Sequence, residues 1–509
     1  MQGVELFKEL LTEYFDRPWV LYGDPDVDGL ISLKLMTEFA EMLGKQYSYY
    51  VNEHRKHGFT LNPSSLRGSL VIASDFTITE KELQVIVDND VAVLSTDHHS
   101  CQSEFISVKG KAKGIVINNQ YPFEPEEDRY LSGAGVFYEL ICSVYPEFKS
   151  KVREALVGVT LLSDVRAIEN SKAREYLRKT YSISTEEPYI NYLISSTLDS
   201  DFGFGVPKLD RNFIDFTLSP TINALLRYNK TTEAVDFILG NGLRTGSKYR
   251  TSQRDLIATM TERSLVLAFP SVVILALNDT YFLDMPDIEL SDFIGALCSN
   301  YKDSHGGIST LGFTISNGVV TRASFRGRYD DIHYLEGFRH IGLDANGHGN
   351  AFGILDFEPT QETWTQINDL VVELEAYHET TYTVIDVPNL SIAMLQYGMK
   401  HATENCYVRD WYRTYWKYTG VCAKVVKETF KTVELTPDDL RLGTKPDVIK
   451  KGVGYKYILD SDGNKIPKYI EYMVDGRTVK SFGVDIKDGV ILPMLERGYI
   501  QLYVKSILD

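Results

Sequence analysis

Three apolar segments near the N-terminus each end in acidic residues, and this pattern limits the possible folds more than any other feature of the chain. The segments cover residues 19–21, 70–74 and 91–96, and the acids that follow them are Asp24, Asp26 and Asp28, then Asp75, then Asp97. Short apolar runs separated by helix-like segments are typical of buried strands in a parallel sheet. The carboxyl ends of such strands meet at one edge, where ligands bind. We therefore expect a doubly wound parallel α/β sheet that gathers these acids at one edge.

The acids at this edge predict a divalent metal site. Asp164 ends a fourth apolar segment, and His98 and His99 directly follow Asp97. Two carboxylates about 4 Å apart repel by about 4 kcal/mol in a partly buried site unless a cation offsets them. Carboxylate oxygens suit Mg²⁺, and imidazole ligands shift the preference toward Mn²⁺. The alternatives are an acidic surface turn or a calcium loop, but a calcium loop requires Glu where this chain has Leu35.

The order and spacing of these residues resemble the four motifs of the DHH phosphoesterase superfamily. The matching positions are residues 23–29, Asp75, residues 97–99 and Asp164. Residues 131–136, which read Leu-Ser-Gly-Ala-Gly-Val, resemble the glycine-bearing segment that the RecJ branch carries between its third and fourth motifs. The chain is thus identified as similar to RecJ-like single-stranded-DNA exonucleases with a DHH-associated domain.

This resemblance implies a centre with two Mn²⁺ or Mg²⁺ ions. Asp75 is expected to bridge them, Asp26 to hold one ion, and Asp28, His98 and Asp164 to hold the other. A structural acid at a strand end is the alternative for any one of these residues, but the full set argues against it.

Three further residues receive catalytic roles from the resemblance. Asp24 is expected to be a further ligand or a base that orients water. Asp97 is expected to accept a hydrogen bond that orients an imidazole, and His99 to donate to the scissile phosphate.

Substrate-binding residues follow from similarity further along the chain. Residues 220–227 are similar to the RecJ segment Arg-Leu-Asn-Ala-x-Gly-Arg, although the first Arg and the Gly are missing, and they contain Asn223 and Arg227. Two segments resemble the substrate-binding motifs of the DHH-associated domain and contribute Ser324, Arg326, Gly347, His348, Gly349 and Asn350. Where the family usually reads Gly-Gly-His, this chain has Asn346-Gly347-His348. The alternative for His348 is a purely structural place in a glycine-rich turn.

The polar connection at residues 53–58 allows two interpretations. It carries two histidines and two basic residues, Glu-His-Arg-Lys-His-Gly. One interpretation is a phosphate contact or an extra metal ligand, and the other is a solvated loop. We favour the solvated loop.

A length of 509 residues suggests about three domains of ~150 residues, and the patterning divides the chain into four regions. These are a DHH catalytic domain at 1–170, a helical connector at 171–265, a smaller α/β DHH-associated domain at 266–355, and a β-rich C-terminal region at 356–509. Alternating stretches on both sides of Asp475-Gly476 predict a hairpin in the last region. By resemblance to bacterial RecJ, this region is expected to be an OB-like nucleic-acid-binding barrel.

Composition limits the cellular setting and the partner. No apolar run reaches the ~20 residues of a membrane span, and the N-terminus lacks signal-peptide features, so we expect a cytoplasmic protein without a membrane partner. The five cysteines include no CxxC pair, which predicts neither zinc nor disulfides.

The net charge of −17 contrasts with the basic surface of most nucleic-acid binders. If the substrate is a nucleic acid, basic residues must be gathered locally, which favours threading one strand over coating a duplex.

The resemblance implies a metal-dependent phosphodiesterase, and more specifically a 5′–3′ exonuclease in DNA repair and recombination that releases mononucleotides from single-stranded DNA. An oligoribonucleotide or cyclic-dinucleotide phosphodiesterase is the alternative, although such enzymes usually have only two domains. A non-enzymatic replication scaffold is the second alternative, but all expected metal ligands are present. Cleavage polarity, DNA or RNA preference and protein partners are left open.

Overall fold

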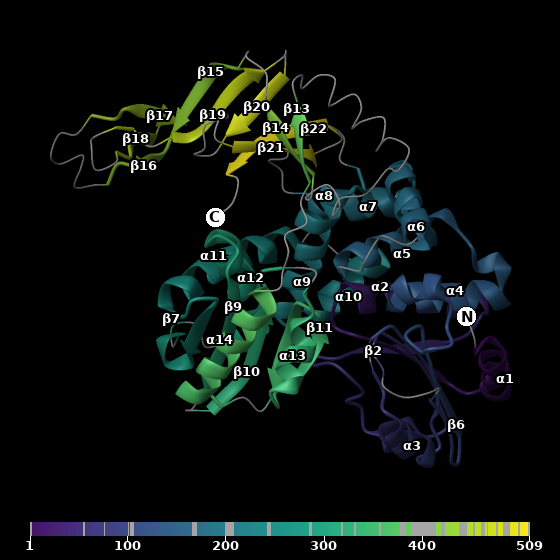
Figure 1. The fold of residues 1–509 in the computed structure, drawn as a ribbon. Helices are drawn as coiled ribbons and strands as arrows, with labels where there is room; N and C mark the ends of the chain where they lie inside the picture. The colour runs from purple at the N-terminus through teal and green to yellow at the C-terminus, as the bar shows by residue number, and fades with distance from the viewer. Residues whose placement is uncertain are drawn as a thin grey trace. The chain divides into compact units, whose positions relative to one another are not determined.

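The apolar segments that end in acids are neighbouring strands of one sheet (Figure 1). The structure, a computed structural model, describes residues 3–53, 56–75, 77–99, 101, 106–164, 171–198, 208–241, 246–282, 284, 288–316, 319–329, 332–355, 358–376, 383–387, 414–418, 423–436, 445–450, 453–459, 464–465, 467–474, 477–481, 489–496 and 499–506. Contacts divide the chain into two compact units, Met1–His378 and Glu379–Asp509.

The first sheet has the order β2-β1-β3-β4-β6-β5. Its strands are β1 (Trp19–Gly23), β2 (Tyr47–Val51), β3 (Leu70–Ser74), β4 (Ala92–Asp97), β5 (Ile106–Lys109) and β6 (Lys113–Asn118). All neighbours pair in parallel except β5, which is antiparallel to β6. Gly23 pairs with Ser74, and Ser74 pairs with Thr96. This register aligns the carboxyl ends of β1, β3 and β4 at one edge.

Helices cover both faces of this sheet, as expected for a doubly wound fold. The helices of this region are α1 (Val4–Tyr14), α2 (Val27–Met42), α3 (Glu80–Asp88), α4 (Gly133–Val144) and α5 (Lys151–Ser163). On one face, Leu83 and Ile86 of α3 pack with Val20 and Val71 of the strands. Side chains alternate between the faces of a strand, and on the other face Trp19 of β1 contacts Phe39 of α2.

The connector is helical, as the sequence predicts. It comprises α6 (Ser171–Ser182), α7 (Pro188–Thr197), α8 (Arg211–Phe213), the π-helical turn η4 (Ile214–Leu218), α9 (Ser219–Arg227), α10 (Thr231–Leu239) and α11 (Gly246–Arg263). Both α9 and α10 pack against α2, the helix that starts at the acidic edge, and α9 also packs against α11.

A second α/β layer follows the connector. Its sheet has the order β11-β12-β10-β9-β8-β7. The strands are β7 (Leu265–Ala268), β8 (Val272–Asn278), β9 (Ser309–Ser316), β10 (Val319–Arg326), β11 (Asp344–His348) and β12 (Ala351–Leu355), and the helices are α12 (Ile294–Ser304), α13 (Tyr334–His340) and α14 (Gln361–Ala376). Only β8 and β9 are parallel neighbours, and α12 connects them.

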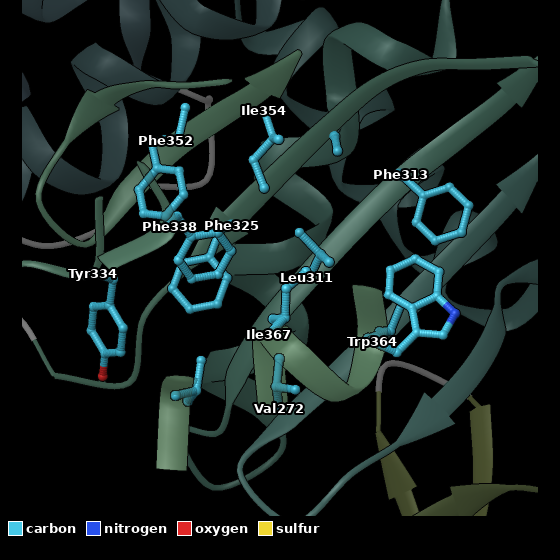
Figure 2. Close-up of a cluster of buried hydrophobic side chains, with 14 of the residues drawn as sticks. Val272, Leu311, Phe313, Phe325, Tyr334, Phe338, Phe352, Ile354, Trp364 and Ile367 are labelled. Carbon is cyan, nitrogen blue, oxygen red and sulfur yellow. The ribbon is translucent and has the colours of Figure 1, made fainter. Parts of the chain in front are cut away.

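One aromatic cluster forms a core of this second layer (Figure 2). Phe325 of β10 stacks on Phe352 of β12, with ring centroids 5.2 Å apart, and meets Phe338 of α13 at 4.7 Å. Trp364 of α14 stacks on Phe313 of β9. Because α14 contributes to this core, packing of the second layer continues beyond residue 355.

The C-terminal region is β-rich, as expected. Its strands are β13 (Thr383–Val387), β14 (Thr414–Tyr418), β15 (Ala423–Phe430), β16 (Thr432–Glu434), β17 (Val448–Lys450), β18 (Val453–Tyr457), β19 (Pro467–Val474), β20 (Arg477–Ser481), β21 (Gly489–Glu496) and β22 (Tyr499–Ser506). The predicted hairpin is present, because β19 and β20 are antiparallel and Val474 pairs with Arg477. The described strands form a seven-stranded mixed sheet, β13-β14-β21-β22-β20-β19-β15, and a three-stranded sheet, β16-β18-β17. This order differs from the five-stranded barrel of an OB-fold.

Across the described parts of both units, no helix has the length and apolar character needed to cross a membrane.

The aromatic cluster yields a stability prediction. Phe325 is fully buried, so Phe325→Ala should leave a cavity and destabilise the protein by about 3–5 kcal/mol. Denaturant unfolding followed by fluorescence measures this loss. Leu355→Ala on β12 is the control, because Leu355 is 53% exposed and its truncation should change stability by less than about 0.5 kcal/mol. Equal effects of the two variants would contradict the assigned core.

Candidate metal centre

The first acidic motif forms a tight turn between β1 and α2. Asp26 is the N-cap residue of α2, and its carboxylate accepts a hydrogen bond from the Gly29 backbone N–H at 2.8 Å. A Cβ on Gly29 would lie 2.4 Å from the Asp24 carbonyl oxygen. Only glycine therefore allows α2 to begin directly against Asp24.

Asp75 follows β3 in a backbone conformation that non-glycine residues rarely adopt. Its φ is 73°, and its backbone N–H donates to the Thr96 carbonyl at 2.9 Å. Gly133, the first residue of α4, lies so close that a Cβ there would be 2.6 Å from the Asp75 Cβ. The glycine-bearing segment 131–136 thus makes room for the Asp75 side chain.

The same helix start binds the carboxylate of Asp28. Asp28 accepts hydrogen bonds from the backbone N–H groups of Gly133 at 2.6 Å and Ala134 at 3.1 Å. Unpaired N–H groups at a helix N-terminus favour an anion. The sequence pointed to segment 131–136 through resemblance but did not reveal this contact, which spans 105 residues.

The predicted metal ligands lie in groups of three at the sheet edge. Their ligand atoms lie within 4.8 Å of one another in each of three sets: Asp24, Asp26 and Asp75; Asp28, His98 and Asp164; and Asp75, His98 and His99. The His98 Nε2 atom is 2.9 Å from Asp75 Oδ1, 3.6 Å from Asp164 Oδ2 and 3.8 Å from Asp28 Oδ2. Asp164 reaches the site from the C-cap of α5, so this acid ends a helix, whereas Asp24, Asp75 and Asp97 lie at strand ends.

Two buried oxygen atoms show that this arrangement fits cations. Asp24 Oδ1 and Asp75 Oδ2 have no hydrogen-bond partner within the described structure, and both residues are at most 2% exposed. Burial and the neighbouring acids Asp28, Asp26, Asp24 and Asp164 raise the pKa of Asp75 well above its ordinary value. Burial and the charges of Asp164 and Asp26 raise the pKa of Asp28 to about 7. Metal ions would supply the missing positive charge.

Asp97 and His99 form a separate pair beside this cluster. Asp97 Oδ1 accepts from His99 Nδ1 at 2.7 Å, and Asp97 Oδ2 accepts from Thr77 Oγ1 and Asn118 Nδ2. Burial alone would raise the pKa of Asp97. The charge and hydrogen bonds of His99 have the larger effect and lower the pKa of Asp97 to about 2. Burial alone would lower the pKa of His99. The negative charge and hydrogen bond of Asp97 have the larger effect and raise the pKa of His99 to about 10. The imidazole that Asp97 orients is therefore that of His99.

Glu53, Lys56 and His57 are exposed, as the solvated-loop interpretation expects, but His57 also contacts the acidic cluster. Its Nδ1 atom donates to Asp24 Oδ2 at 2.5 Å, and so His57 belongs to the surroundings of the acidic cluster. No sequence signal separated His57 from its polar neighbours, because the contact depends on how the loop folds back over β1. His54 and Arg55 lie outside the described residues.

Ser324 and Arg326 lie together at the end of β10 in the second sheet. Arg326 Nη1 donates to Ser324 Oγ at 2.9 Å, and Arg326 Nε donates to Ser299 Oγ of α12 at 3.2 Å. A Cβ on Gly295 of α12 would lie 2.5 Å from Arg326 Nη2. Sequence reasoning missed Ser299, which accepts this hydrogen bond, and Gly295, whose lack of a side chain leaves room for the guanidinium group.

The glycine-rich turn lies beside Arg326. Arg326 and His348 both pair with Ala351, from β10 and β11 respectively, while the His348 side chain lies outside the description. The Gly327 N–H donates to the Asn350 carbonyl at 2.7 Å, and the Leu335 N–H donates to the Gly349 carbonyl at 2.9 Å. Gly347 has a φ of 141°, a backbone conformation that favours glycine.

Asn223 and Arg227 occupy a third location, on α9. Arg227 Nη1 donates to Gln253 Oε1 of α11 at 2.9 Å, and Asn223 is partly exposed. The expected substrate-binding residues therefore form separate groups, on α9 and at the end of the second sheet.

Comparison with known proteins adds independent information. Residues 19–163 match the family model described as the DHH family, N-terminal domain. A curated relative, the single-stranded-DNA-specific exonuclease RecJ of Bacillus subtilis (strain 168), is 25% identical over 232 residues. That alignment covers 43% of this chain and 28% of the relative, so the chain matches less than a third of that protein.

Solved structures show the same fold. The structure of RecJ from Thermus thermophilus in complex with Mn²⁺ has a TM-score of 0.64 at 16% identity, covering 100% of this chain and 70% of that one. The Mg²⁺ complex from the same organism has a TM-score of 0.55 at 12% identity, covering 100% and 69%.

Residues 19–163 thus match a DHH-family domain. The fold of the chain is similar to that of RecJ.

The crowded carboxylates yield a prediction about metal-dependent stability. The raised pKa of Asp75 means that its ionised form destabilises the metal-free fold once the pH exceeds about 4. At pH 8, Asp75→Asn should therefore stabilise the protein in EDTA, and Asn tolerates the positive φ. Mn²⁺ at about 100 times its Kd should stabilise the wild type by about 2.7 kcal/mol, and the variant should lose most of this gain. Thermal unfolding with and without Mn²⁺ measures both effects.

The matched control is Asp284→Asn, which removes an exposed acid paired with Arg263. This control should respond to Mn²⁺ like the wild type. An undiminished Mn²⁺ response in Asp75→Asn would exclude Asp75 as a ligand.

Proposed function

We propose that this protein is a divalent-metal-dependent phosphodiesterase that degrades single-stranded DNA from the 5′ end and releases mononucleotides. The observation that carries the proposal is the pair of mostly buried ligand groups at the edge of the first sheet, Asp24, Asp26 and Asp75 beside Asp28, His98 and Asp164. Two adjacent groups of oxygen and nitrogen ligands suit a two-metal hydrolase. The similarity to a RecJ named for single-stranded DNA supports the choice of substrate.

The residues of the two ligand groups have distinct roles that suit phosphodiester hydrolysis. Mn²⁺ or Mg²⁺ ions, when bound, supply a Lewis acid that activates water and neutralises charge on the phosphate. Asp75 is proposed to be shared by the two ions, because its carboxylate lies both with Asp24 and Asp26 and next to His98. The hydrogen bonds from Gly133 and Ala134 fix the orientation of Asp28.

His99 is the proposed donor to the scissile phosphate. Its Nδ1 atom is held by Asp97, which is itself fixed by Thr77 and Asn118. This anchoring holds the ring in one orientation beside the ligand groups, so that its remaining nitrogen can serve as a hydrogen-bond donor.

Binding of the nucleic acid is assigned to the end of the second sheet. Arg326 offers a planar guanidinium group that suits phosphate oxygens, and the backbone of the turn at residues 347–350 lies beside the end of β10. A local basic site of this kind is needed in a chain with a net charge of −17. Asn223 and Arg227 on α9 are assigned to the same task.

The decisive experiment measures cleavage in Mn²⁺ of single-stranded DNA labelled at either end, with a short RNA oligonucleotide and a cyclic dinucleotide in parallel. We expect stepwise mononucleotide release from the 5′ end of DNA, and no release in EDTA or with Asp75→Asn. Preference for the RNA or the cyclic dinucleotide would retain the metal chemistry but replace the substrate. Absence of all cleavage would favour the non-enzymatic scaffold.

Arg326 provides a separate test of substrate binding. Arg326→Ala should raise KM for single-stranded DNA about tenfold or more and change kcat less, since a hydrogen bond to a charged group contributes about 1.5–3 kcal/mol. The control is Arg263→Ala, which removes an arginine paired with Asp284 and should leave KM unchanged. A fall in kcat at constant KM would contradict a binding role for Arg326.

A further inference from the structure

His57 makes a direct contact with the acidic cluster from outside the ligand groups. Its Nδ1 atom lies 2.5 Å from Asp24 Oδ2. Asp24 is 1% exposed, whereas the His57 side chain is 49% exposed. The second carboxylate oxygen, Asp24 Oδ1, is buried and without a partner in the described structure. One oxygen of Asp24 is thus held by His57, and the other remains available to the group that includes Asp26 and Asp75.

The loop carrying His57 is held in place by a buried asparagine. Asn52 Nδ2 donates to the carbonyl of Lys56 at 2.7 Å and to the carbonyl of Gly58 at 2.8 Å. These two carbonyls lie on either side of His57. Asn52 is 1% exposed, so its amide fixes the backbone at both neighbours of the histidine from within the protein.

Tyr22 connects this asparagine to the strand that carries Asp24. The Tyr22 hydroxyl donates to Asn52 Oδ1 at 2.5 Å, and its ring stacks on Tyr50 and Phe59 with centroids 5.2 Å apart in both cases. Tyr22 is fully buried and precedes Asp24 by two residues on the same chain segment. β1 therefore determines the position of the carboxylate and, through Tyr22, that of its histidine partner.

We propose that His57 is a positioning residue that fixes the rotation of the Asp24 carboxylate, so that Asp24 Oδ1 is presented as a metal ligand together with Asp26 and Asp75. The inference rests on the proposed function, because it concerns one of the two ion-binding groups assigned there. It adds a residue from outside the recognised motifs. Hydrogen bonds to ligating carboxylates of this kind typically change metal affinity by about 10–100-fold.

The atom involved makes the proposal specific. The contact uses Nδ1, which stands one bond beyond Cγ, as does the side-chain nitrogen of asparagine. His57→Asn can therefore place an N–H donor near Asp24, whereas glutamine places its nitrogen one bond further out. A positioning role predicts that Asn restores metal binding and that Gln does not. A role in bulk or loop stability alone would not distinguish the two amides in this order.

The experiment titrates Mn²⁺ into the full-length metal-free protein and follows the free-ion signal by electron paramagnetic resonance. The wild type is expected to bind two ions. In His57→Ala and His57→Gln, one ion should bind about 10–100-fold more weakly while the affinity of the other changes by less than about threefold. His57→Asn should stay within about threefold of the wild type at both sites. His340→Ala removes an exposed histidine of α13 and should match the wild type.

A second variant tests the anchor without altering either partner of the hydrogen bond. Tyr22→Phe removes the hydroxyl that holds Asn52 and should weaken the same ion in the same direction, by about 3–10-fold, as expected for one buried hydrogen bond of about 1 kcal/mol. Equal Mn²⁺ binding by the wild type and all His57 variants would overturn the inference and leave the proposed function intact. Equal weakening in Ala, Asn and Gln would also overturn it. A wild type that binds no Mn²⁺ would refute the proposed function, and this inference with it.

Discussion

Electrostatic repulsion between carboxylates in a nearly dry pocket is the constraint on which the rest of this structure depends. Asp24, Asp28 and Asp75 are each at most 2% exposed, and the ligand groups to which they belong share one sheet edge. Such crowding is unfavourable unless positive charge or hydrogen-bond donors face the oxygens. The N-terminus of α4 and His57 provide such donors within the protein. The remaining demand for positive charge is what makes the edge suitable for divalent ions.

The surrounding backbone brings the acidic residues close together without steric conflict. Gly29 lets α2 start against Asp24, and Gly133 lets α4 start against Asp75. The parallel register of β1, β3 and β4 sets the spacing between the motifs. Sites carried by regular elements are held more firmly than sites on loops, and here two helix starts and three strand ends share one region.

Sequence reasoning was successful where local pattern determines structure. Continuous apolar runs predicted the parallel strands, and their shared edge brought Asp24, Asp75 and Asp97 together. It failed where a contact depends on tertiary folding. The bond between His57 and Asp24 joins a loop to a strand end, and the bond between Asp28 and Gly133 joins segments 105 residues apart. Neither contact produces a periodic signal, so only the folded chain reveals them. In the C-terminal region, alternation predicted strands and a hairpin but not the order in which strands pair.

The hydrogen bonds from the start of α4 to Asp28 have a consequence for how the protein acquires its structure. Residues 28 and 133 must be brought together across a long intervening chain before the carboxylate gains these donors, and closing such a distant contact is slow compared with forming local helices. We therefore expect the ligand groups to assemble late, after β1, β3 and β4 have paired. Ions that recognise only the completed arrangement act mainly by slowing unfolding. In a cell, metal supply would accordingly govern the lifetime of the folded protein more than the rate at which new chains mature.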